Sequence, residues 1–298
     1  MAAQRGDSAP SLAEVLHAAR GALKRAGIEE HVHEAEALVQ HALALSPARL
    51  FSSLRDPVPP EAAARLEELL ARRLTREPLA YITGTRGFYG REFSVDPGVL
   101  IPRPETELLV ELALAAVARR GAGQPRIADI GTGSGVLAIT LALEAPDADL
   151  EASDISAAAL RVAHRNAAQH GVEARVRFVQ GDLGRPLSGV FDVVLANLPY
   201  VRPETLARAA PELRREPELA LHGGSDGLAV IRRLLGQLPR LLMARGGIAL
   251  LEVDPVTAAP TRVLARAALP GATVRLHRDL AGLERCVEIQ TPGAATPA

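Results

Sequence analysis

A strand, a glycine-rich turn and a helix follow one another in residues 126–145, and this unit constrains the fold more than any other feature of the chain. The run "RIADI" predicts a short buried strand, and "GVLAITLALEA" predicts a buried helix. Between them, Gly131, Gly133 and Gly135 let the backbone turn sharply. Units of this kind build parallel sheets with right-handed crossovers, so we expect an α/β fold.

Strands and helices continue to alternate along the rest of the chain. Apolar runs predict further strands, and apolar residues spaced three and four apart predict helices between them. The final "ATVRLHRDLAGLERCVEIQ" predicts two strands joined by a loop, so the sheet is expected to close with an antiparallel hairpin. The other predicted strands are residues 149–154, 175–182, 191–197 and 246–254, and the other predicted helices are residues 156–171 and 226–242.

The N-terminal region has a different, purely helical pattern. From Leu12 to Arg76 three segments repeat apolar residues at helical spacing, which predicts a small domain of three to five helices. Ser11 is a candidate N-cap, with Glu14 completing a capping box. Gly27 is placed to end the first helix.

A segment rich in β-forming residues, glycine and proline follows Pro78, which interrupts the helical pattern. It predicts a hairpin-like connector leading into a helix that begins near Pro104. We therefore expect a helical domain over residues 1–77, a connector over 78–103 and a third region over 104–298. Aromatic residues in the connector are expected either to fill a domain interface or to shape a pocket; they are Tyr81, Phe88, Tyr89 and Phe93.

Composition excludes several classes of function. A formal net charge of −1 and a pI near 6.7 disfavour a protein that binds long nucleic acid through its overall charge. Cys286 is the single cysteine, which rules out an intramolecular disulfide and a cysteine-based metal site. No apolar stretch has membrane-spanning length, so we expect a cytoplasmic protein with no membrane partner.

A histidine cluster, His31, His33 and His41, lies in one predicted helix. Residues two apart point to different faces of a helix, so His31 and His33 do not easily share a metal ion. We expect solvated helix positions here, and no metal site.

The glycine loop and the next strand together predict a nucleoside site. Asp154 ends that strand, 21 residues beyond Gly133, where a carboxylate accepts hydrogen bonds from both ribose hydroxyls. Dinucleotide-dependent dehydrogenases and S-adenosylmethionine enzymes share this arrangement, and the glycine spacing favours the second class because Val136 follows Gly135. The predicted cofactor-binding loop is Gly131, Thr132, Gly133, Ser134 and Gly135.

Two further residues follow the next strand, in "VQGDL". Asp182 is a candidate acceptor for an adenine amine, and Leu183 is a candidate cover for the ring. The alternative for Asp182 is a turn or helix-capping aspartate, and the sequence leaves both open.

The fourth strand ends in "ANLPY", which favours methyl transfer to a planar nitrogen. Such a nitrogen is a weak nucleophile, and it needs hydrogen-bond acceptors aimed at its N–H groups as it becomes positive. The side chain of Asn197 and the carbonyl of Leu198 provide two, Pro199 fixes the turn, and Tyr200 can pack on a planar group. We predict Asn197, Pro199 and Tyr200 as catalytic, and Asn197 to Tyr200 as substrate-binding.

These motifs together resemble the release-factor glutamine methyltransferase family (the HemK/PrmC type) over nearly the whole chain. The segments that carry the resemblance are "REPLAYITGTRGFYG", "VLIPRPETELLVE", "IADIGTGSGVLAI", "NLPY" and "REPELALHGGSDGL". "LIPRPETE" is the most specific, because nucleic-acid amino methyltransferases with an Asn-x-Pro-Tyr group generally lack it. The family usually has proline where Leu198 stands, and some members have an aromatic residue in place of Leu183.

The resemblance implies a Rossmann-like S-adenosylmethionine-dependent methyltransferase fold, with a mostly parallel seven-stranded sheet. It implies methyl transfer to the glutamine amide of the Gly-Gly-Gln loop of bacterial release factors, with residues 1–77 helping to dock the release factor. Its cofactor contacts fall on Gly131 to Gly135, Asp154, Leu183 and Asn197. We expect a monomer without direct nucleic-acid binding. The alternatives are a nucleic-acid adenine or cytosine amino methyltransferase and a non-enzymatic adenosine-binding module.

Overall fold

The computed structural model describes residues 9–120, 123–244 and 246–292. The chain divides into two compact units, Met1–Gly84 and Thr85–Ala298. In the described part of the chain, no helix combines the length and the apolar character needed to cross a membrane.

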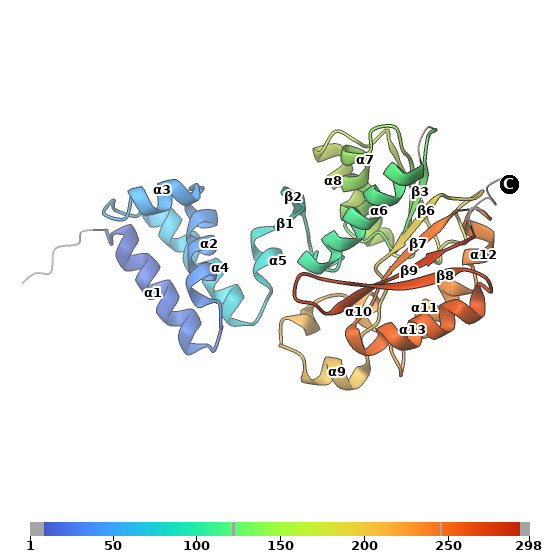
Figure 1. Cartoon of the computed structure of the whole chain (residues 1–298). Coiled ribbons are helices and arrows are strands. Elements are labelled where there is room, and N and C mark those ends of the chain that lie inside the picture. The colour runs from blue at the N-terminus through green and yellow to red at the C-terminus, as the bar shows by residue number, and fades with distance from the viewer. Residues whose placement is uncertain (1–8, 121–122, 245, 293–298) are drawn as a thin grey trace, which may run out of the picture. The chain divides into compact units, whose positions relative to one another are not determined.

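The N-terminal unit is a bundle of five helices among its described residues (Figure 1). Leu23, Leu38 and Leu50 are fully buried at its centre. The guanidinium of Arg73 is buried and lies 2.5 Å from the carboxylate of Glu34, so a salt bridge joins two helices of the bundle. The helices are α1 (Leu12–Arg25), α2 (His31–Leu43), α3 (Pro47–Ser52), α4 (Pro60–Leu74) and α5 (Leu79–Thr83).

The predicted ends of the first helix are confirmed. Ser11 accepts from the backbone of Glu14, and the Glu14 carboxylate accepts from the Ser11 N–H at 2.8 Å. Gly27 lies just beyond the helix with a left-handed φ of 70°. The prediction that helix ends at Arg76 is wrong, because Pro78 directly precedes α5, where its missing N–H costs no hydrogen bond.

The C-terminal unit begins with the predicted hairpin and continues into the sheet. Strands β1 (Thr85–Phe88) and β2 (Arg91–Ser94) pair antiparallel. Phe88 and Phe93 from these strands pack edge to face, with ring centroids 6.2 Å apart, in the core of this unit. A short turn of 3₁₀ helix, η1 (Pro104–Thr106), leads into α6 (Glu107–Arg120), as predicted.

The seven-stranded sheet predicted from the sequence is confirmed, in the order β5-β4-β3-β6-β7-β9-β8. The first five strands in this order run parallel, while β9 is antiparallel to both β7 and β8. The strands are β3 (Arg126–Ile130), β4 (Asp149–Asp154), β5 (Val176–Gln180), β6 (Val193–Ala196), β7 (Ile248–Glu252), β8 (Thr273–Arg278) and β9 (Glu284–Gln290).

Helices cover both faces of the sheet (Figure 1). Ile127 and Leu195 face the core formed with α6, α7 (Val136–Glu144) and α8 (Ala157–Gln169). Ala128 and Val194 face the opposite core. The helices of that second face are α11 (Ala229–Leu235), α12 (Leu238–Leu241) and α13 (Pro255–Ala268), and three short elements precede them, α9 (Pro203–Arg208), η2 (Leu213–Arg215) and α10 (Glu218–Leu221).

Two helical predictions need correction. Residues 226–242 form α11 and α12 instead of one helix, because Pro239 lacks an N–H and its ring clashes with the carbonyl four residues earlier. The sequence prediction also contains no helix over Pro255–Ala268. There, Asp254 forms a capping box and Pro255 occupies the first turn, while Pro260 interrupts the pattern.

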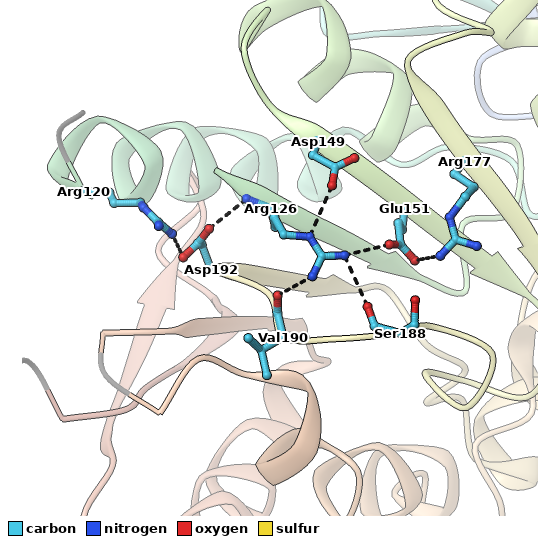
Figure 2. A network of polar contacts seen from close by, with 8 residues as sticks. All are labelled: Arg120, Arg126, Asp149, Glu151, Arg177, Ser188, Val190 and Asp192. Atoms are coloured by element: carbon cyan, nitrogen blue, oxygen red, sulfur yellow. Dashed lines mark hydrogen bonds and ion pairs between the residues drawn. The ribbon is translucent and has the colours of Figure 1, made fainter. Parts of the chain in front are cut away.

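A network of charges joins the amino ends of the parallel strands (Figure 2). Arg126, which begins β3, donates to Glu151 at 2.8 Å, to Asp149 at 3.2 Å and to the carbonyl of Val190 at 2.9 Å. Glu151 is buried and is also paired with Arg177. Arg126 therefore ties β4 and the segment before β6 to the first residue of β3.

We predict that Arg126→Met lowers the free energy of unfolding by about 2 kcal/mol, because a buried carboxylate loses one cation and two carbonyls lose their donor. Urea unfolding measures this. The matched control is Arg177→Met, whose side chain is 53% exposed and for which a loss of under about 1 kcal/mol is expected. Equal losses in the two variants would contradict the role given to Arg126.

Candidate active site

A pocket opens at the carboxyl ends of β3, β4, β5 and β6. Successive strands each contribute residues from the loop that follows them, as expected for a parallel sheet. Two other segments, around residues 98–106 and 217–220, complete its walls. The sequence-predicted residues that line it are Gly131, Thr132, Gly133, Ser134, Asp154, Asp182, Leu183, Asn197, Leu198 and Pro199.

The glycine loop has two distinct functions in this structure. Gly133 has a left-handed φ of 57°, and a side chain there would meet no atom within 4 Å, so its backbone borders open space. Gly135, predicted to bind cofactor, does not line the pocket. A Cβ at Gly135 would lie 3.1 Å from the Cβ of Ala163, so this glycine permits α7 to approach α8.

Asp154 is held rigidly at the end of β4. Its Oδ2 accepts from the N–H of Gly133 at 2.9 Å, and its Oδ1 accepts from the N–H of Ser156 at 2.8 Å. Burial raises the pKa of this carboxyl, and the backbone donors oppose the rise. A carboxylate has about four acceptor positions, more than these backbone donors occupy, so it can still accept from a hydroxyl in the pocket.

Asp129, near the end of β3, is hydrogen-bonded to the glycine loop. It is only 1% exposed, its Oδ2 accepts from the Thr132 hydroxyl at 2.6 Å, and its Oδ1 has no partner among the described residues. Burial raises the pKa of Asp129 to about 6, despite the donors from Thr132 and Ala138. The carboxylate thus links Thr132, near the start of the loop, to the first turn of α7.

Asp182 and Leu183 both reach the pocket, with different constraints. Both oxygens of Asp182 lie 2.5 Å from Nη2 of Arg233, which also lines the pocket. Leu183 has a left-handed φ of 53°, and its carbonyl accepts from the Ser153 hydroxyl at 2.8 Å. This bond holds a strained residue in place at the pocket wall.

A buried hydrogen-bond chain holds the "NLPY" segment. Asn197 donates from Nδ2 to the Thr106 hydroxyl at 3.1 Å, and Thr106 donates to Oε2 of Glu252 at 2.6 Å. Tyr200 donates from its hydroxyl to Oε1 of the same carboxylate at 3.1 Å. Tyr200 does not line the pocket, so in this structure its hydroxyl anchors the end of the turn.

Leu198, which replaces the usual proline, is fixed by packing. Its side chain is 5% exposed, and its Cδ2 lies 3.0 Å from where a Cβ on Gly131 would be. A side chain at Gly131 would displace Leu198. Close packing against the glycine loop thus restrains the turn where a proline ring would otherwise fix φ.

Sequence reasoning missed three acidic or hydroxyl groups, Thr106, Glu216 and Glu252. Glu216 is buried, accepts from the N–H of Ile101 at 3.0 Å and is paired with Arg103, so it joins two walls of the pocket. Thr106 lies in "VLIPRPETELLVE" and Glu216 in "REPELALHGGSDGL", two of the segments that carry the family resemblance. Glu252 carried a signal too, as an acid ending an otherwise apolar strand. In the described part of the chain no cluster of residues is suited to hold a metal ion.

We predict that Asp129→Asn changes how stability depends on pH. The folded-state pKa of about 6 exceeds the ordinary 3.8, so ionising Asp129 disfavours folding. The stability that protonated Asp129 contributes at low pH is lost as pH rises through 6. From about pH 4 to pH 8, the wild type is expected to lose about 2 to 3 kcal/mol relative to Asp129→Asn. Urea unfolding across this range measures the difference; a constant difference would contradict the buried charge.

Comparison with known proteins shows the family. Residues 14–84 match the family described as PrmC N-terminal domain, and residues 105–247 match the methyltransferase small domain. Among solved structures, the hMettl16 catalytic domain in complex with MAT2A 3'UTR hairpin 6 has a TM-score of 0.54 at 16% identity, covering 80% of this chain and 84% of that chain. That likeness shows the fold alone.

Relatives of this chain over most of its length are named release factor glutamine methyltransferase. The protein from Cereibacter sphaeroides is 42% identical over 285 residues, or 95% of this chain and 99% of its own. Those from Neisseria gonorrhoeae and Deinococcus radiodurans are 44% and 38% identical, covering 85% and 95% of this chain and 90% and 99% of their own. The resemblance noted in the sequence is confirmed: the chain is a methyltransferase and belongs to the release factor glutamine methyltransferase family.

Proposed function

We propose that this methyltransferase moves a methyl group from S-adenosylmethionine to the side-chain amide nitrogen of the glutamine in the Gly-Gly-Gln motif of peptide chain release factors. The observation that carries the proposal is the orientation of Asn197, whose Nδ2 is bound to Thr106 at 3.1 Å. In the described part of the chain no group donates to its Oδ1. That oxygen is available to accept from an N–H in the pocket.

The residues of the pocket fit the methyl donor. Asp154 is placed to accept from ribose hydroxyls, and the backbone at Gly133 leaves open space for the amino-acid part of the molecule. Leu183 offers an apolar surface for adenine, and Asp182 offers an acceptor for its amine beside Arg233. When bound, S-adenosylmethionine supplies an electrophilic methyl group on a sulfonium.

The acceptors of the "NLPY" segment suit an amide nitrogen. An amide lone pair is delocalised, so the nitrogen becomes a nucleophile only as positive charge on it is stabilised. In this proposal Asn197 Oδ1 and the Leu198 carbonyl accept from its two N–H groups, and Pro199 fixes the turn that leads to Tyr200; Asn197, Leu198 and Pro199 all line the pocket. Packing of the Tyr200 ring against the glutamine stays a prediction.

The proposal extends to the partner and its docking. The relatives named above are release factor enzymes, which supports release factors as the substrate. We propose that the helical domain predicted over residues 1–77 helps to dock them, and that the enzyme acts as a monomer in the cytoplasm. The match of residues 14–84 to the PrmC N-terminal domain supports a separate N-terminal domain in this chain.

The direct test is mass spectrometry of a bacterial release factor incubated with this enzyme and S-adenosylmethionine. One added methyl on the Gly-Gly-Gln peptide is expected, and none on a release factor whose glutamine is replaced by alanine. Labelling of ribosomal RNA or DNA, with the release factor unmodified, would overturn the proposal in favour of a nucleic-acid amino methyltransferase. No labelling of any substrate while the donor binds would favour an adenosine-binding module.

We predict that Asn197→Ala lowers kcat by about 100-fold or more while leaving the Kd of S-adenosylmethionine within about threefold, because its acceptor is needed mainly during transfer. Single-turnover kinetics and calorimetry measure the two quantities. A parallel loss in both would contradict this role.

Asp154→Ala is the matched comparison and should behave in the opposite way. It removes a half-buried carboxylate that lines the pocket, so the Kd is expected to rise about tenfold or more. At saturating donor, kcat should recover most of its wild-type value. An unchanged Kd by calorimetry would remove Asp154 from the proposed donor site.

A further inference from the structure

Glu252 is a buried acid in a position that explains the orientation of Asn197. It ends β7, the neighbour of β6, and is 2% exposed. Its two oxygens accept from two hydroxyl groups, Thr106 at 2.6 Å and Tyr200 at 3.1 Å. One carboxylate therefore reaches both ends of the "NLPY" segment, through Thr106 at Asn197 and directly at Tyr200.

The direction of this hydrogen-bond chain is fixed by its last member. An ionised carboxylate only accepts, so Thr106 must donate its single hydroxyl hydrogen to Glu252. The Thr106 oxygen is then left to accept, and the only side-chain group of Asn197 able to donate to it is Nδ2. Oδ1 of Asn197 is consequently the end that remains for the pocket.

The reversed amide would be inactive. If Thr106 instead donated to Asn197, the amide would turn over and present Nδ2 to the bound nitrogen, where an acceptor is required. Asn and Gln amides are nearly symmetric in shape, so packing alone discriminates weakly between the two orientations. A buried acceptor linked through a hydroxyl supplies the missing discrimination.

The surroundings of Glu252 act on its ionisation in opposite directions, and burial is the strongest influence. Burial raises the pKa of its carboxyl, while the hydroxyls of Thr106 and Tyr200 and the positive charge of Arg285 lower it. The nearby carboxylate of Glu105 acts in the opposite sense. A buried acid held by two hydroxyl donors costs more free energy than an apolar residue would, which favours a role beyond packing.

We infer that Thr106 and Glu252 are positioning residues, which fix the Asn197 amide with its oxygen toward the substrate nitrogen. This inference rests on the proposed function, since the substrate nitrogen is defined there. It also accounts for the pairing of two sequence motifs: the threonine of "LIPRPETE" is the residue that orients the asparagine of "NLPY".

Kinetics of Thr106 variants test the inference. Thr106→Val keeps the shape but loses the hydroxyl, and we expect kcat to fall about 10- to 100-fold with little change in KM or in the Kd of S-adenosylmethionine. Thr106→Ser keeps the hydroxyl and should retain kcat within about threefold. Equal activity of the valine and serine variants would overturn the inference.

A double-variant cycle separates positioning from a merely structural role. Because Thr106 is inferred to act through Asn197, adding Thr106→Val to Asn197→Ala should lower kcat no further. Additive losses would show that Thr106 acts independently, and would overturn the inference. Glutamine at position 252 can donate as well as accept, so the kcat of Glu252→Gln should lie between those of Thr106→Ser and Thr106→Val. Full activity of Glu252→Gln would remove Glu252 from the hydrogen-bond chain.

A measurement without substrate keeps the inference distinct from the proposed function. The side-chain amide of Asn197 gives a pair of ¹H–¹⁵N signals that Asn197→Ala identifies by their loss. In the wild type and in Thr106→Ser, hydrogen exchange at this amide should be slowed, and Thr106→Val should accelerate it about tenfold. No acceleration would overturn the positioning role, whichever substrate the wild type methylates.

Discussion

The parallel pairing of β3, β4, β6 and β7 is the constraint on which the site depends. Ile130 pairs with Ser153 on one side and with Ala196 on the other, and Ala196 pairs in turn with Leu251. With their carboxyl ends level, the residues that follow each strand meet at one edge of the sheet. The glycine loop, Asp154, Asn197 and Glu252 are brought together in this way, although they are distant in the sequence.

The two edges of the sheet have separate functions. At the amino ends, Arg126 and its carboxylate and carbonyl partners join β3, β4 and the segment before β6 in one network (Figure 2). At the carboxyl ends, polar groups converge on the pocket. The network at the amino ends therefore supports stability, while the carboxyl ends carry the groups that line the pocket.

Three carboxylates form the framework of the site: Asp129 and Glu252, which are buried, and Asp154, which is half-buried. Burial raises the pKa of each, so each is a cost to folding that hydrogen-bond donors offset. Their partners are backbone N–H groups and hydroxyls that belong to neighbouring loops. These bonds fix the loops before any ligand arrives, which is the preorganisation that stabilises developing charge effectively.

The sequence by itself determined the class of the fold and the part of the pocket formed directly after β3, β4, β5 and β6, because both depend on local patterns. Alternating strands and helices gave the sheet, and residues directly after strands gave Asp154 and Asn197, since strand ends converge in any parallel sheet. Local patterns failed where proline obscured them, at the break between α11 and α12 and across α13.

Only the tertiary structure decided how the site is held. Thr106 lies 91 residues from Asn197 and 146 from Glu252, and no local rule pairs residues so far apart. Gly135 and Tyr200 do not line the pocket. Gly135 lets α7 pack closely against α8, and the Tyr200 hydroxyl is hydrogen-bonded to Glu252. The physical reason is that a hydrogen bond between buried side chains depends on where two backbones meet in space, and the sheet register sets that position.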